Sequence, residues 1–128
     1  RWYSDLFVMA VAYKILGQKQ PATSYQVLYK VPITPDNVFG SRRVRRAVVS
    51  NITICNFSLS VDRGYYIRVV PNGETAADKH VLFENKEIGT TDIHFLQVKI
   101  MLEVGDEVQV KLNGSAVVAI SAFGFEVF

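Results

Sequence analysis

Cysteine and histidine are scarce in this sequence, which contains one Cys, Cys55, and two His, His80 and His94. A single cysteine cannot close a disulfide within the chain, and it also excludes a zinc site made mainly of thiolates. There is no His pair at a four-residue spacing, no Cys-x-x-Cys, no glycine-rich phosphate loop with a lysine and no nucleophile elbow. We therefore expect a protein that is not an enzyme and that has no catalytic residues, no metal and no cofactor.

The few metal-type side chains have ordinary expected roles. Cys55 falls in an apolar run and is predicted to be a small buried side chain. His80 follows Asp78 by two residues, a spacing that allows a metal site, but a hydrogen bond within a turn is the expected role of this histidine.

Long apolar runs and a dominant sign of charge are also missing. The longest apolar run near the start covers residues 6–13, far short of the ~20 residues that a membrane span needs. The 14 Lys and Arg nearly balance the 12 Asp and Glu, for a net charge of +2, and such a balance does not predict a nucleic-acid binder. Neither a membrane nor a nucleic acid is expected as a partner.

Apolar and polar residues alternate along most of the 128-residue chain, which is the pattern of half-buried β-strands. Residues 94–102 and 107–113 show it most clearly, and Val104–Gly105–Asp106 lies between them as a turn signal. We expect these two strands to form a hairpin, and Asn113–Gly114 predicts a second hairpin to the strand that follows. The expected core residues are Ile52, Ile54, Leu96, Val98, Ile100, Val108, Val110 and Leu112.

Turn residues separate about eight such strands, and only residues 74–79 resemble a helical turn. The predicted fold is all-β: an antiparallel β-sandwich, jelly-roll-like, with about eight strands. Residues 1–17 are expected to form an N-terminal extension or arm, and residues 18–128 the β-sandwich domain. Within the long strand 44–56 the apolar phase slips near Ser50 and Asn51, which predicts a β-bulge.

Arginine is concentrated in one short segment, Arg42–Arg43–Val44–Arg45–Arg46. Its closely spaced guanidiniums make a local positive field that suits the carboxylates of an acidic partner protein. The simpler interpretation is a solvated loop whose charges discourage edge-to-edge strand pairing. If the segment binds a partner, Arg42, Arg43, Arg45 and Arg46 are the residues that do so, and without an aromatic platform beside them nucleic acid is not the predicted partner.

Apolar residues are left over at both ends of the chain once the alternating strands have supplied the core. The closing run, residues 116–128, is apolar on both faces, so its second face needs a cover. Left in water, these residues would form a larger apolar patch than monomers usually tolerate. We expect a homo-oligomer, with a trimer as one option. The residues predicted to contact the partner are Trp2, Tyr3, Phe7, Phe125 and Phe128.

Several stretches together carry a family resemblance. They are residues 9–18 (MAVAYKILGQ), 27–32 (VLYKVP), 47–56 (AVVSNITICN), 66–73 (YIRVVPNG), 104–110 (VGDEVQV) and 122–127 (AFGFEV). This layout resembles a widespread family of small structural proteins of tailed bacteriophages, including cyanophages. The chain departs from the family pattern in the longer and more basic loop 34–46 and in residues 1–8, which have no counterpart.

The resemblance implies a virion component built on a β-sandwich, such as a capsid decoration, neck, tail or fibre-associated protein, with other virion proteins as partners and no cofactor. The leading hypothesis is therefore a structural virion protein that acts through protein–protein assembly. The alternative is a carbohydrate- or receptor-binding module on a phage fibre, which exposed Tyr or Trp beside acids on one loop edge would favour. A tail-borne glycan hydrolase is the third hypothesis, but the sequence singles out no catalytic pair of carboxylates.

Overall fold

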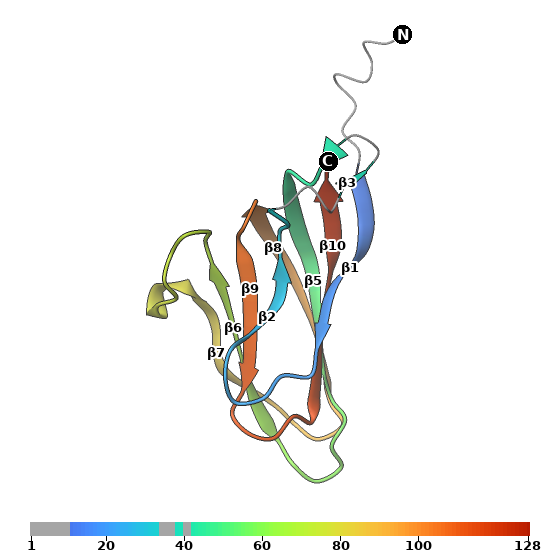
Figure 1. Cartoon of the computed structure of the whole chain (residues 1–128). Helices are drawn as coiled ribbons and strands as arrows, with labels where there is room; N and C mark the ends of the chain where they lie inside the picture. The colour runs from blue at the N-terminus through green and yellow to red at the C-terminus, as the bar shows by residue number, and fades with distance from the viewer. Residues whose placement is uncertain (1–10, 34–37, 40–41) are drawn as a thin grey trace.

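The computed structural model describes residues 11–33, 38–39 and 42–128, which form two four-stranded antiparallel sheets packed face to face (Figure 1). Sheet A consists, in spatial order, of β1 (Val11–Lys19), β10 (Val118–Val127), β5 (Arg46–Asn56) and β8 (Ile93–Glu103). Sheet B consists of β2 (Gln26–Lys30), β9 (Glu107–Leu112), β6 (Arg63–Val70) and β7 (Val81–Ile88). The short elements are β3 (Val38–Phe39), β4 (Arg42–Arg43) and the 3₁₀ turn η1 (Asp78–His80).

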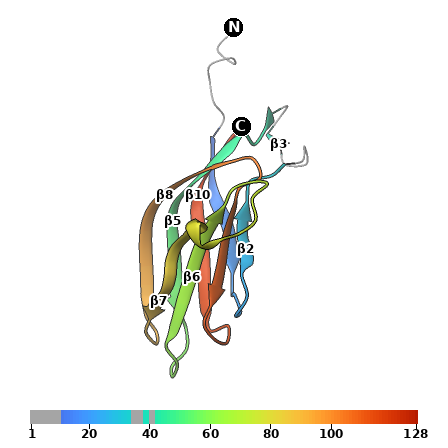
Figure 2. The same ribbon diagram turned by 90° about the vertical axis from the view of Figure 1, so that its left-hand side faces the viewer.

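The strand pairs are nested along the chain. The innermost pair is β6 with β7, followed outward by β5 with β8, β2 with β9, and β1 with β10. A chain paired in this way is one long hairpin rolled up into two sheets, which is the jelly-roll arrangement. Figure 2 looks onto the outer side of sheet B, with sheet A behind it. The predicted all-β antiparallel sandwich of about eight strands is confirmed.

Both predicted hairpins are wrong. The turn at Val104–Gly105–Asp106 connects β8 in sheet A to β9 in sheet B, and Asn113–Gly114 connects β9 to β10 back in sheet A. The first turn is tight, with Gly105 at φ 87° and a hydrogen bond from Asp106 N to Glu103 O of 3.0 Å. A connection that arches over the core leaves alternate residues buried on both flanking strands, as a hairpin does, so the local pattern does not separate the two.

The core lies between the sheets and largely follows the predicted strand phase. Five predicted core residues are at most 1% exposed: Ile52, Ile54, Val108, Val110 and Leu112. The other three, Leu96, Val98 and Ile100, point to the same core but are only partly buried. They belong to β8, which is an edge strand of sheet A and has a covering neighbour on one side only.

The predicted bulge in β5 is confirmed, because the register of β5 with β8 shifts between Val49 and Asn51. The bulged Ser50 donates from Oγ to the carbonyl of Phe123 at 3.2 Å. Beyond the bulge Ile54 and Asn56 point inward, so Cys55 points outward and is half-buried. The expectation of a fully buried Cys55 is therefore wrong.

The predicted N-terminal arm is also wrong in its extent. Residues 11–17 are part of β1, which pairs with β10 over its whole length, and residues 1–10 lie outside the described part of the chain. Gly17 sits at a bulge in β1, where a Cβ atom would lie 1.9 Å from the carbonyl oxygen of Leu28. This close approach of backbone to backbone ties β1 to the strand that follows it in sheet B.

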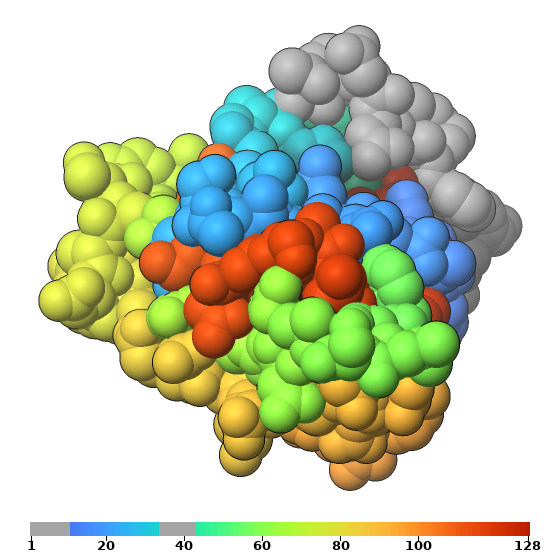
Figure 3. All heavy atoms as spheres, turned by 90° about the horizontal axis from the view of Figure 1, so that it is seen from below, coloured from blue at the N-terminus to red at the C-terminus, as the bar shows by residue number. Residues whose placement is uncertain are grey.

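The connections β1–β2, β5–β6, β7–β8 and β9–β10 close one end of the sandwich, the end that Figure 3 views. Hydrogen bonds link them to one another and to neighbouring strands. Leu112 N donates to Ala22 O at 2.8 Å, Thr91 N donates to Ser58 O at 3.2 Å, and Arg63 Nη2 donates to Ser115 Oγ at 2.6 Å. The arginine segment lies at the opposite end, beside the C-terminus (Figure 1).

Candidate interaction surface

The outward-facing side of sheet A exposes large apolar side chains to solvent, with polar ones such as Gln97 and Lys99 between some of them. We call it the outer apolar face. Its half-buried centre contains Phe123 and Phe125 of β10, which lies between the edge strand β1 and the inner strand β5. Its exposed members are Val11, Tyr13 and Ile15 on β1 and Ile93, Phe95 and Met101 on β8.

Strand register arranges these side chains in rows across the sheet. Tyr13 lies opposite Phe125, Phe125 opposite Val48, and Val48 opposite Met101, so one row crosses all four strands. The rings of Tyr13 and Phe125 are 5.1 Å apart between centroids, in a tilted arrangement. Side chains opposite one another on a sheet pack together, so the row is a continuous apolar ridge.

An open hollow of about 380 Å³ interrupts this face beside the ridge. Tyr13, Ile15 and Phe123 line it with apolar side chains, and Lys14, Ser50 and Gly124 complete the lining. Gly124 is at the point where β10 and β5 slip in register, and a Cβ atom there would lie 1.9 Å from Val48 O. The β5 bulge therefore places two small residues, Ser50 and Gly124, in the lining of the hollow.

The arginine segment borders the same face. Val44 is 3% exposed and fixes the segment in the core, while Arg45 N donates to Val127 O at 2.7 Å. Arg46 opens β5 and lies opposite Val127 on one side and Glu103 on the other. Arg43, Arg45 and Arg46 are exposed, and no carboxylate of the described residues forms an ion pair with them.

The structure brings together part of the predicted partner-binding set. Phe125 lies on the outer apolar face, and Arg43, Arg45 and Arg46 lie at its border. Phe128 does not belong to this surface, because it is 6% exposed and packs in the core cluster of the sandwich. The predicted residues Trp2, Tyr3 and Phe7 lie outside the described residues, as does the side chain of Arg42.

Sequence reasoning missed most of the outer apolar face. On the face of β8 that carries Gln97 and Lys99, the chain also places Ile93, Phe95 and Met101. The signal was present in the alternation of 93–103, where apolar residues occur in both phases. It points to a strand whose outer side is covered by something else.

A buried carboxylate, that of Glu126, lies in the core near the end of sheet A that carries the arginine segment. Glu126 is 1% exposed, accepts a hydrogen bond from the hydroxyl of Tyr29 at 2.5 Å, and pairs with Nζ of Lys14 at 3.0 Å. Burial, and then the hydrogen bond to Glu126, raises the pKa of Tyr29 far above its ordinary value. The cluster fastens edge strand β1 to both sheets.

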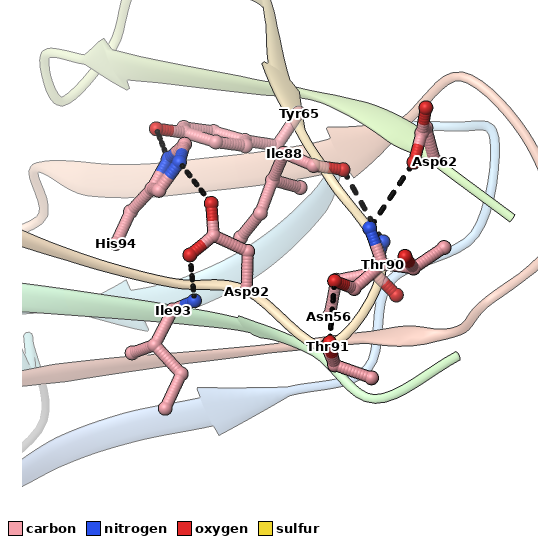
Figure 4. A network of polar contacts seen from close by, with 9 residues as sticks. All are labelled: Asn56, Asp62, Tyr65, Ile88, Thr90, Thr91, Asp92, Ile93 and His94. Carbon is pink, nitrogen blue, oxygen red and sulfur yellow. Dashed lines mark hydrogen bonds and ion pairs between the residues drawn. The ribbon is translucent and has the colours of Figure 1, made fainter. Parts of the chain in front are cut away.

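A second polar cluster lies toward the closed end of the sandwich (Figure 4). The hydroxyl of Tyr65 is 3.0 Å from Nδ1 of His94, and Nε2 of His94 is 3.5 Å from Oδ2 of Asp92. With the imidazole proton on Nε2, Tyr65 donates to Nδ1. Tyr65 is 0% exposed and its burial raises its pKa to about 12, so the phenol is a neutral donor that is out of reach of a substrate.

His80 closes a turn before β7, as the sequence predicts. Its Nδ1 accepts a hydrogen bond from Ala77 N, so Nε2 carries the proton and donates to Glu74 Oε1 at 3.0 Å. The hydrogen bond from His80, followed by that from Lys79, lowers the pKa of Glu74. In the described part of the chain no three His, Cys, Asp or Glu side chains gather closely enough to hold a metal ion.

No family model, curated protein or solved structure matches this chain. The resemblance to structural proteins of tailed phages therefore remains a prediction from the sequence. Among residues 11–33, 38–39 and 42–128, no helix is long and apolar enough to cross a membrane.

Proposed function

We propose that this chain is a structural subunit of a tailed-phage virion and acts by assembly, with the outer apolar face of sheet A packing against a second copy of the chain. The observation that carries the proposal is the exposure of large apolar side chains on this face. Tyr13 is 79% exposed and Phe95 is 76% exposed. A jelly roll with such a face is suited to packing sheet against sheet.

The size of the face fits a stable contact. Aromatic side chains bury ~150–250 Å² each, so Tyr13 and Phe95 together expose about 300 Å². The four other exposed members, Val11, Ile15, Ile93 and Met101, are 42–65% exposed. They bring the apolar area to roughly 600 Å², the upper end for the largest patch of a typical monomer. With the half-buried and polar residues between them, the face approaches the ~800 Å² per partner of a standard interface.

The charges at the border of the outer apolar face favour a second copy of the chain as the partner that packs against it. Arg46 and Glu103 lie in register across β5 and β8 at the edge of the face, one of each sign. In a two-fold contact each copy presents the same patch to the other, so an axis passing between these two residues would bring Arg46 of one copy to Glu103 of its partner. Arg43 and Arg45 extend the positive side toward further acidic subunits of the particle.

The contact is tested by a charge placed on the face. Phe95→Lys should convert an oligomer into a monomer, because a lysine buried within an apolar interface loses its hydration. Multi-angle light scattering over a concentration series measures the mass. The matched control is Leu59→Lys, because Leu59 is 87% exposed but lies in the β5–β6 connection at the closed end. Wild type that stays monomeric at the highest concentration would refute self-association.

The virion role is tested separately. An antibody against this chain should detect it in purified particles at a copy number comparable to that of other structural subunits. Detection only in the soluble fraction of the lysate, with none in particles, would reject the virion assignment and leave the self-association to stand on its own measurement.

A further inference from the structure

Two tyrosine rings and two cations form a platform on the outward-facing side of sheet B, away from the outer apolar face. The guanidinium carbon of Arg68 lies 3.6 Å from the ring centroid of Tyr25. Nζ of Lys111 lies 4.8 Å from the Tyr25 centroid and 4.4 Å from that of Tyr66. The two rings meet edge to face, with centroids 6.4 Å apart. Contacts of this kind attract a cation to the ring face.

Most polar groups of this platform make no hydrogen bond or ion pair with the described residues. Arg68 donates from Nε to Gln109 Oε1 at 2.6 Å, and Gln109 in turn donates to Glu107 at 2.8 Å. None of the ion pairs of the described residues involves Arg68 or Lys111. The terminal nitrogens of Arg68, the ammonium of Lys111 and both phenol hydroxyls therefore remain available as donors.

The two cations are close, and they are held in place. Tyr66 pairs with Lys111 and Arg68 with Gln109 in the register of β6 and β9, so Arg68 and Lys111 are diagonal neighbours on one face. Like charges at neighbouring positions of a sheet repel each other. The rings restrict both side chains to one region, so an arriving anion meets donors that have already lost much of their freedom.

We propose that this platform binds an acidic carbohydrate, meaning a sugar that carries a carboxylate or sulfate among its hydroxyl groups. Arg68 and Lys111 would hold the anionic group through charge-assisted hydrogen bonds. The hydroxyls of Tyr25 and Tyr66 would bond to sugar hydroxyls beside it. Burial raises the pKa of Tyr25, which keeps this phenol a donor.

The surrounding charges favour a sugar over a nucleic acid. Glu84 and Asp78 both act on Tyr25 electrostatically. These carboxylates would repel a second or third phosphate of a nucleic-acid backbone, which needs a continuous positive track. A ligand with one negative group surrounded by hydroxyls meets the cations with its charge and the carboxylates with its hydroxyls.

The test is a titration of the ¹⁵N-labelled full chain with these sugars and anions, in which amide chemical shifts report binding. Glucuronate should shift amides around Arg68 and Lys111 in a saturable manner, with glucose showing at least about tenfold weaker binding because it lacks the charge. Inorganic sulfate should also bind at least about tenfold more weakly than glucuronate. Sulfate that binds as tightly as glucuronate would overturn the carbohydrate assignment. Tighter binding of a short single-stranded oligonucleotide would overturn it as well.

Variants locate the site. Arg68→Gln and Lys111→Gln should each weaken glucuronate binding about tenfold or more, since each removes a charged donor. The matched control is Lys99→Gln, because Lys99 is exposed on sheet A, the other sheet. It should bind glucuronate as wild type does. Equal weakening in all three variants would show that net charge alone attracts the ligand and would overturn the site.

Discussion

At the scale of single residues, the buried carboxylate of Glu126 makes Lys14 a stabilising residue. Lys14 comes from an edge strand and supplies the positive charge to a carboxylate that is 1% exposed. Lys14→Met should lower the free energy of unfolding by about 2–3 kcal/mol. That is less than the ~3–5 kcal/mol of a fully buried pair, because water reaches the Lys14 side chain.

Urea unfolding followed by tryptophan and tyrosine fluorescence measures this loss. Lys19→Met is the matched control, because Lys19 is an exposed lysine of the same strand and has no ion pair among the described residues. A loss of the same size in both variants would show that β1 tolerates neither substitution for reasons unrelated to Glu126.

The raised pKa of Tyr65 makes the free energy of unfolding depend on pH in the alkaline range. Burial raises its pKa to about 12 from 10.0, so above pH 10 the unfolded chain ionises this phenol while the folded chain keeps it neutral. Its contribution to stability is fully present below pH 10 and is lost as the pH rises through 12. The loss amounts to about 3 kcal/mol for a shift of this size. Tyr65→Phe should flatten the fall in unfolding free energy over this range, whereas a curve as steep as that of wild type would contradict the prediction.

At the scale of elements, the bulge of β5 beside β10 depends on a glycine in β10. A Cβ at position 124 would lie 1.9 Å from Val48 O, a backbone atom that cannot turn away. Gly124→Ala should cost about 3 kcal/mol or more through overpacking, measured by urea unfolding. Gly89→Ala is the control, because the nearest atom to its new Cβ is 3.8 Å away. Gly89→Ala should change the free energy of unfolding by less than about 1 kcal/mol. Similar losses in the two variants would contradict the close approach of β10 to β5 at Gly124.

The strand connections show which features the local sequence pattern predicts and which it does not. Alternation over 94–102 and 107–113 predicts two half-buried strands correctly, and Gly105 predicts the turn between them. Whether the chain folds back in the same sheet or arches to the other depends on partners far away in sequence. For β8 that partner is β5, and for β9 the partners are β2 and β6.

At the scale of the whole molecule, the outer apolar face and the tyrosine–cation platform lie on opposite outer sides of the sandwich. An oligomer formed through sheet A would leave sheet B exposed, so the two proposals are independent. Phe95→Lys should bind glucuronate as wild type does, and Arg68→Gln should keep the wild-type mass in light scattering. Loss of glucuronate binding in Phe95→Lys would show that the two faces are coupled and would contradict this independence.

The sequence alone determines the strand phase of 107–113, the bulge at Ser50 and the turn role of His80, because each depends on neighbours within a few residues. It also predicts Arg43, Arg45 and Arg46 as exposed cations. Tertiary structure decided the rest. Glu126 becomes a core residue only because Lys14, 112 residues earlier in the chain, and Tyr29 lie beside it. The outer apolar face and the platform likewise gather residues from strands that only the rolled-up pairing brings together, and alternation along one strand carries no information about which strand lies next to it.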